Sequence, residues 1–179
     1  LEDSVENLKT IVLDMVRPKP VVVAAQPDTS GAEEIKLYIV HDESDRDAVR
    51  DLRRALKDKV VNGKPLKLVL PVFDGDAASL REIQRQRLIE SDAVLIYWGG
   101  GSQAWVEAAL SEIRKSPGFG RSKPFKAKHM VYLTGNKTSA KEDWWLDFKD
   151  GLLEADLLTV EAYGGVPIAA IDPFINSIS

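Results

Sequence analysis

The chain has 179 residues, of which 44% are hydrophobic and 29% are charged, the composition of one globular domain with a real core. The formal net charge of -4 is mildly acidic and does not indicate a nucleic-acid partner. There is no cysteine, which excludes disulfides, thiolate metal sites and a cysteine nucleophile. No stretch approaches ~18 consecutive apolar residues, and the acidic start lacks the features of a signal peptide. We therefore expect a cytoplasmic protein with no membrane partner.

The first part of the chain differs in pattern from the rest. Apolar residues recur at helical spacing over 4–16, and three prolines with Ser, Gly and Asp indicate a linker over 17–34. We expect an N-terminal helix and Pro-rich linker over 1–34 and an α/β domain over 35–179. The chain begins with Leu1 rather than Met, which we interpret as a domain cut from a longer protein.

From residue 35 onward, strand and helix patterns alternate. The expected strands are near-continuous apolar runs at 35–42, 66–74, 93–101, 129–136 and, more weakly, 157–162. The expected helices have apolar residues at helical spacing, several of them after a capping residue such as Ser44 or Ser102, and cover 44–61, 77–92, 102–116, 141–149 and a closing segment at 167–179. This alternation predicts an α/β fold: a flavodoxin-like, doubly wound parallel sheet of four or five strands. Ligands of such sheets bind beyond the carboxyl ends of the strands.

The first polar cluster at that edge is HDESDRD, residues 41–47. Four acids after a strand are compatible with a Mg²⁺ or phosphoryl site. Such a site also requires an acid at the end of the third strand, where this chain has Tyr97, Trp98 and Gly99. We therefore favour a solvated turn whose acids stabilise the start of a helix. The FDGDAAS segment at 73–79 is interpreted as a turn with Asp76 as a helix cap, and no metal site is predicted.

The third strand runs into WGGGSQAW, residues 98–105. Three glycines between a strand and a helix allow a phosphate to approach backbone N–H groups at the helix N-terminus. The spacing matches neither the dinucleotide fingerprint nor the P-loop. One of the flanking tryptophans is a candidate to stack on a base or nicotinamide ring, although Trp105 fits a core position equally well.

A basic run follows, with Arg114, Lys115, Arg121, Lys123, Lys126 and Lys128 and no acid between them. Contact with phosphates or an acidic partner is one interpretation. A solvated loop is favoured, since the run lacks the series of aromatic residues that stacks nucleic-acid bases.

Several segments resemble TIR-like domains. SDAVLIYWGGGSQAWVEAALSEI (91–113) is similar to their third strand, Ser-containing loop and Trp-x-x-x-Glu-Leu helix. IKLYIVHDESDRDAV (35–49) and LKLVLPVFDGDAAS (66–79) resemble their first two strands and the loops that follow. The likeness covers about residues 35–150 and is greatest to the divergent bacterial TIR-like domains found beside STAND-type NTPase modules in conflict proteins.

The resemblance implies NAD as the substrate, because catalytic TIR domains hydrolyse NAD with a glutamate four residues after the Trp. Here Trp105 and Leu110 match, but the glutamate position is Ala109. A carboxylate there is thought to stabilise the positive charge on the ribose as nicotinamide leaves. The domain is then a natural scaffold, a variant engineered at this position, or an enzyme in which Glu107 or Glu112 substitutes. Glu112 is one helical turn beyond Ala109 on the same face.

Three functions remain open. The first is a TIR-like signalling domain of a larger bacterial defence protein, partnered by itself or by other domains of the parent chain. The second is an NAD glycohydrolase with a displaced or engineered-away glutamate. The third is a flavodoxin-like nucleotide-binding module. No cofactor is required, and NAD is the candidate substrate or ligand. The predicted binding residues are His41, Asp42, Trp98, Gly99, Gly100, Ser102 and Trp105, and the candidate catalytic acids are Glu107 and Glu112.

Overall fold

The structure, a computed structural model, describes residues 33–164 and 168–178. The predicted N-terminal helix and nearly all of the linker lie outside the described residues. The elements in chain order are β1 (Ile35–His41), η1 (Glu43–Asp45), α2 (Arg46–Leu56), β2 (Val60–Val61), β3 (Lys64–Val69), α3 (Ala77–Glu90), β4 (Ala93–Trp98), α4 (Gln103–Lys115), η2 (Ser116–Phe119), β5 (His129–Leu133), α5 (Ser139–Lys149), β6 (Leu157–Glu161), η3 (Ile168–Ala170) and α6 (Asp172–Asn176).

The strands form one sheet in the order β2-β3-β1-β4-β5-β6. β3, β1, β4, β5 and β6 are parallel, and only the two-residue β2 runs antiparallel to its neighbour. The prediction of an α/β parallel sheet is confirmed. The expected four or five strands become six, because the short edge strand β2 adds to five parallel ones. The order of the parallel strands is consistent with a flavodoxin-like fold, and it reverses between β1 and β4.

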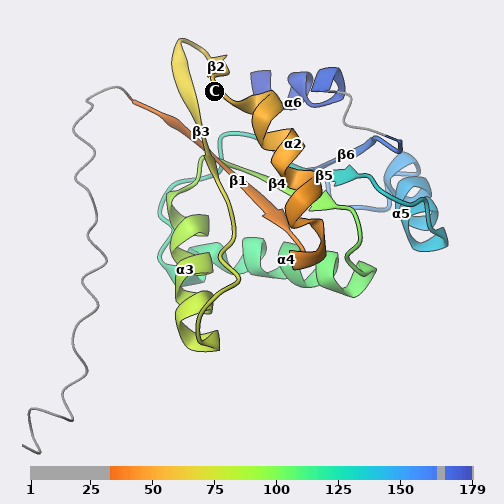
Figure 1. The fold of residues 1–179 in the computed structure, drawn as a ribbon, viewed down its shortest axis with the longest axis horizontal. Helices are drawn as coiled ribbons and strands as arrows, with labels where there is room; N and C mark the ends of the chain where they lie inside the picture. The colour runs from red at the N-terminus through yellow and green to blue at the C-terminus, as the bar shows by residue number, and fades with distance from the viewer. Residues whose placement is uncertain (1–32, 165–167, 179) are drawn as a thin grey trace, which may run out of the picture. The chain divides into compact units, whose positions relative to one another are not determined.

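Two apolar clusters lie on the two faces of the sheet, and together they form the core. On one face, Leu37 and Ile39 of β1 share a cluster with Leu52 of α2 and Phe174 of α6. On the other face, the strands meet α3, α4 and α5 through residues such as Leu88, Val106, Leu110 and Trp144. Figure 1 shows α2 lying across the strands and α5 beside the end of the sheet that is formed by β6. Every residue of β4 is buried, as two covered faces require.

Several predicted boundaries were wrong, most clearly at the ends of α2 and β3. The helix expected over 44–61 ends at Leu56, and the chain then forms the hairpin of β2 and β3. The hairpin turns at Asn62 and Gly63, whose φ angles of 51° and 76° fit a type I′ turn. The strand expected over 66–74 ends at Val69, two residues before Pro71, which has no N–H to donate to a sheet.

Capping residues fix the helix starts around the candidate site. The Asp76 carboxylate accepts hydrogen bonds from the backbone N–H groups of Ala78 and Ser79, as predicted for α3. Ser102 caps α4 by accepting from the N–H of Trp105, also as predicted. Ser44, in contrast, does not cap α2: it lies within η1, whose cap is Asp42.

Candidate functional site

The carboxyl end of β1 places His41, its last residue, and Asp42, which follows it, at the carboxyl edge of the sheet. The Asp42 carboxylate accepts from the N–H of Ser44 at 3.0 Å and from its hydroxyl at 2.7 Å, and these bonds lower the pKa of Asp42. His41 lies with its ring centroid 5.2 Å from that of Phe73, and its Nδ1 is 2.8 Å from the carbonyl oxygen of Asp42. Burial lowers the pKa of His41, so the imidazole is neutral at pH 7.

The glycine loop, residues 99–101, is hydrogen-bonded to a carboxylate of the protein itself. The buried Asp45 accepts from the N–H groups of Gly99 at 3.1 Å and Gly100 at 2.7 Å. A Cβ atom at Gly99 would be 2.2 Å from Asp45 Oδ1, which explains why glycine is needed there. Two of the N–H groups that the sequence offered to a phosphate, those of Gly99 and Gly100, are therefore already bonded to Asp45.

A buried lysine fixes the opposite side of the same loop. Lys141 is 2% exposed, and its Nζ donates to the carbonyls of Gly99 (2.6 Å), Thr134 (2.6 Å) and Asn136 (2.9 Å). Burial lowers the pKa of Lys141, and the nearby Asp45 opposes that shift. Asp45 and Lys141 thus hold the backbone of Gly99 from both sides. Sequence reasoning missed this pair, because one lysine in a charged helix gives no signal of burial.

The two tryptophans that flank the glycines have different roles. Trp98 is 1% exposed, its indole N–H donates to the Gly101 carbonyl at 2.7 Å, and its ring meets Trp144 edge-on. Trp98 is therefore part of the core. Trp105 is only partly buried and lines an open pocket, with its ring packed beside Gly101.

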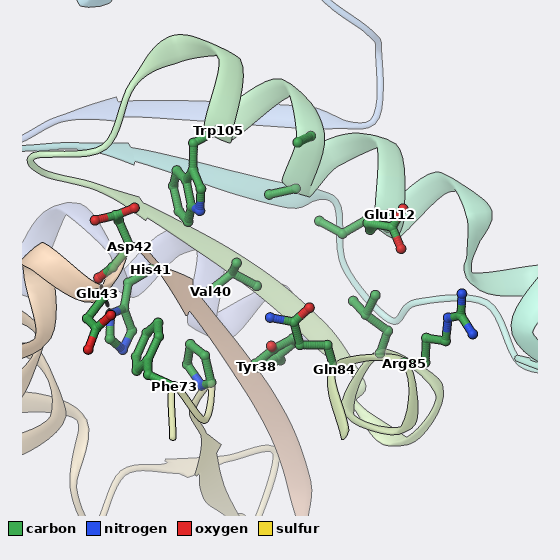
Figure 2. A pocket seen from close by; sticks show the side chains of 15 residues that line it. Tyr38, Val40, His41, Asp42, Glu43, Phe73, Gln84, Arg85, Trp105 and Glu112 are labelled. Carbon is green, nitrogen blue, oxygen red and sulfur yellow. Dashed lines mark hydrogen bonds between the residues drawn. The ribbon is translucent and has the colours of Figure 1, made fainter. Parts of the chain in front are cut away.

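That pocket lies between the end of β1, the segment after β3, and helices α3 and α4. It has a volume of about 320 Å³. Figure 2 shows Trp105 and Glu112 on α4, with His41 at the end of β1 and Asp42 and Glu43 directly after it. Tyr38 of β1, Phe73 and the α3 residues Gln84 and Arg85 complete the polar and aromatic part of the lining. Aromatic rings, three acids and Arg85, whose guanidinium lies over the ring of Phe119, line one cavity and suit a small ligand with a flat ring and hydroxyl or phosphate groups.

The structure separates the two candidate acids of α4. Glu112 and Ala109 line the pocket, whereas Glu107 is exposed and accepts from Gln103 at 2.9 Å without lining it. Glu112 is paired with Lys115 at 3.2 Å. Of the residues predicted to bind a ligand, the pocket brings together His41, Asp42 and Trp105, and leaves Trp98, Gly99, Gly100 and Ser102 outside its lining. Sequence reasoning did not single out Phe73, which follows β3, or Gln84 and Arg85, which belong to α3.

Much of the basic run after α4 is engaged within the domain. Arg121 is buried and donates to the carbonyls of Leu88, Ile89 and Ser91 at the end of α3, with Phe125 stacked 3.5 Å from its guanidinium carbon. Arg114 pairs with Glu154, and Lys126 pairs with Asp92 at 2.9 Å. These contacts hold the segment after α4 against the rest of the domain.

Over residues 33–164 and 168–178, no three side chains of His, Asp or Glu gather as metal ligands would. In the same part of the chain, no helix has both the length and the apolar character of a membrane span. Neither a scan against protein-family models nor a search of curated proteins found a match to this chain. The fold and the cavity together define an α/β domain with a pocket beside the point where its strand order reverses.

Proposed function

We propose that this chain is a TIR-like signalling domain, part of a larger bacterial defence protein, whose pocket binds a nicotinamide nucleotide such as NAD without cleaving it. One observation carries the proposal. Trp105 and Ala109 of the segment with TIR-like resemblance line the same cavity as His41 and Asp42 of the first strand and loop. Position 109 is where the resemblance implies the glutamate that cleaves NAD, four residues after Trp105, and His41 and Asp42 are among the predicted binding residues.

The lining offers suitable chemistry for each part of such a ligand. The partly buried ring of Trp105 can stack on nicotinamide or adenine. The carboxylates of Asp42 and Glu43 are acceptors for ribose hydroxyls, and the Arg85 guanidinium is a donor for a phosphate. Neutral His41 provides one further donor or acceptor.

The absence of cleavage follows from position 109. As nicotinamide leaves, the ribose becomes positively charged, and a carboxylate must lie close to it. Ala109 lines the pocket and cannot supply that charge. The reacting ribose is therefore left without its electrostatic partner.

A second function, NAD glycohydrolysis with a displaced acid, is supported by one observation. Glu112 lines the pocket one helical turn beyond Ala109, whereas Glu107 does not. If the domain is an enzyme, Glu112 is the acid that would carry the reaction.

The test is to measure NAD binding and nicotinamide release by the wild type, Ala109→Glu and Ala104→Glu. Ala104 is exposed on the same helix but outside the pocket, so it is the matched control. We expect the wild type to bind without turnover, and Ala109→Glu to release nicotinamide roughly tenfold or more faster than Ala104→Glu. Wild-type turnover that Glu112→Gln abolishes and Glu107→Gln leaves intact would establish the second function instead. Failure of all variants to bind NAD at about 1 mM, a weak-binding limit, would contradict both.

A further inference from the structure

A second cavity lies at the amino ends of β5 and β6, whereas the nucleotide pocket includes the last residue of β1. This cavity has a volume of about 480 Å³ and is bordered by the end of α4, the segment that follows η2 and the residue before β6. We call it the amino-edge cavity. It shares only the buried Ile113 of α4 with the nucleotide pocket.

The wall of the amino-edge cavity contains a buried histidine with unused hydrogen-bonding capacity. His129, the first residue of β5, is 8% exposed, and its Nδ1 atom has no partner. Over residues 33–164 and 168–178, its imidazole makes no hydrogen bond and meets the ring of Phe125 edge-on at 4.7 Å. A buried polar group without a partner destabilises the fold, so the unbonded imidazole indicates a partner from outside the chain.

The amino-edge cavity carries more positive than negative charge. Its lining includes Arg114, Arg121 and Lys123, and among the described residues Asp156 is its single acid. Arg114 is paired with Glu154. Arg121 donates to backbone carbonyls only, and Lys123 has no ion-pair partner in the described part of the chain. Two cations are therefore left against one carboxylate.

The side chains of this lining are mainly hydrogen-bond donors. Lys123 and the guanidinium of Arg121 can only donate, and the Nε atom of Arg121 has no acceptor. The hydroxyl of Ser122 and the imidazole of His129 can donate as well. A phosphate group matches such a lining, because it offers three acceptor oxygens and a charge of roughly -1.5 to -2 at pH 7.

We propose that the amino-edge cavity is a second binding site, which holds the phosphate group of a small molecule with Lys123 and His129 among its donors. The ligand is inorganic phosphate or a phosphate monoester, which present the same group. This site gives a role to part of the basic run that follows α4. It does not rest on the nucleotide pocket, whose lining contains neither Lys123 nor His129.

Protonation of His129 should be coupled to the anion. The charged groups that line the cavity around it are Arg114 of α4, Arg121 and Lys123 after η2, and Asp156 before β6. Burial lowers the pKa of His129, Asp156 opposes that shift and Arg121 adds to it. A bound anion stabilises the imidazolium and raises this pKa, so binding takes up protons. Affinity for an anion should therefore rise as the pH falls below 6.5.

The test is an NMR titration of the full chain with inorganic phosphate and, separately, glycerol 3-phosphate, with sodium chloride holding the ionic strength constant. We expect saturable shifts at the His129 ring and the Lys123 N–H, with a dissociation constant on the order of 1 mM. Lys123→Gln should weaken binding roughly fivefold or more. Lys128→Gln, which neutralises an exposed cation of the same segment outside the lining, should bind as the wild type does. Tighter binding of one compound supports the proposal and names its source.

A second titration uses sulfate, whose charge stays constant between about pH 7.5 and about pH 5.5, so that a change in affinity reports the protein. The affinity should rise roughly threefold or more over this range, and His129→Leu should remove the rise. Lys123→Gln tests the site independently if His129→Leu does not fold.

Three results would overturn the proposal. These are no saturable shift at His129 up to about 50 mM phosphate, equal weakening by Lys123→Gln and Lys128→Gln, or shifts at Trp105 that Arg85→Gln removes, which would place the anion in the nucleotide pocket. A chain that binds phosphate at His129 but fails to bind NAD would contradict only the nucleotide function.

Discussion

The glycine loop and the pocket beside it are neighbours in space, but they differ in how their polar groups are satisfied. In the loop, Asp45 accepts from two backbone N–H groups and Lys141 donates to three carbonyls, all within the protein. In the pocket, Glu43, Glu112 and Trp105 border open space. The loop has the sequence pattern of a ligand site but serves to hold the fold together. The side chains that border open space lie next to it, and of these Glu43 and Glu112 are paired only with Arg46 and Lys115 on their own surface.

The largest expected effect is on the free energy of unfolding, to which we expect the glycine loop to contribute more than the pocket. Lys141→Met leaves three buried carbonyls without their charged donor, and should lower the free energy of unfolding by about 3 kcal/mol. Glu112→Gln replaces a largely exposed side chain of the pocket. It should change the free energy of unfolding by less than about 0.5 kcal/mol. Urea unfolding of both variants measures the difference. Equal effects would show that the loop carries no special share of stability.

The next effect is on ligand affinity. Trp105→Ala removes the stacking surface of the pocket and should weaken NAD binding by about 1–3 kcal/mol, roughly 5- to 150-fold. Trp145→Ala is the control, because Trp145 stacks on Phe148 at 5.6 Å on α5, away from the pocket. Isothermal titration of the two variants compares them. An unchanged affinity in Trp105→Ala would place the ligand elsewhere.

A smaller effect concerns pH. Burial lowers the pKa values of His41 and His129 below 6.5, so the folded state binds fewer protons than the unfolded state just below that pH. The contribution of the two neutral histidines to the free energy of unfolding should therefore be complete above pH 6.5 and decline as the pH falls below it. We expect the Tm to fall by a few degrees. The carboxylates with lowered pKa, such as Asp42 and Glu90, lose their contribution only at lower pH, as they are protonated in the fold. Thermal unfolding of His129→Gln should show a shallower decline between pH 6.5 and 5 than the wild type.

The fold was readable from the sequence because each element had its own local signal. Apolar runs located the parallel strands, and Asp76 and Ser102 located the starts of two helices. Asn62-Gly63 is itself a strong local signal for a hairpin, but the helix predicted over 44–61 included the first strand of that hairpin, Val60–Val61. Local pattern thus accounts for the sheet, apart from its edge strand.

The candidate site was only partly readable. The sequence pointed to His41, Asp42, Trp105 and Glu112, because each lies next to a strand end or in the TIR-like segment. It did not point to the engagement of Gly99 and Gly100 by Asp45, which lies 54 residues before Gly99. Which N–H groups are free depends on contacts between distant segments, and no spacing rule reports them. Sequence therefore located the right edge of the sheet and misjudged which groups there are available.

The central claim is that a nicotinamide nucleotide contacts the pocket and leaves the glycine loop bonded to Asp45. The most direct measurement is an NMR titration of the ¹⁵N-labelled domain with NAD, following the indole N–H of Trp105 and the backbone N–H groups of Ala109, Gly99 and Gly100. We expect large, saturable shifts at Trp105 and Ala109 and small ones at the two glycines, whose N–H groups are held at 3.1 and 2.7 Å from the Asp45 carboxylate. Large shifts at the glycines with none at Trp105 would contradict it, because the ligand would then have displaced Asp45.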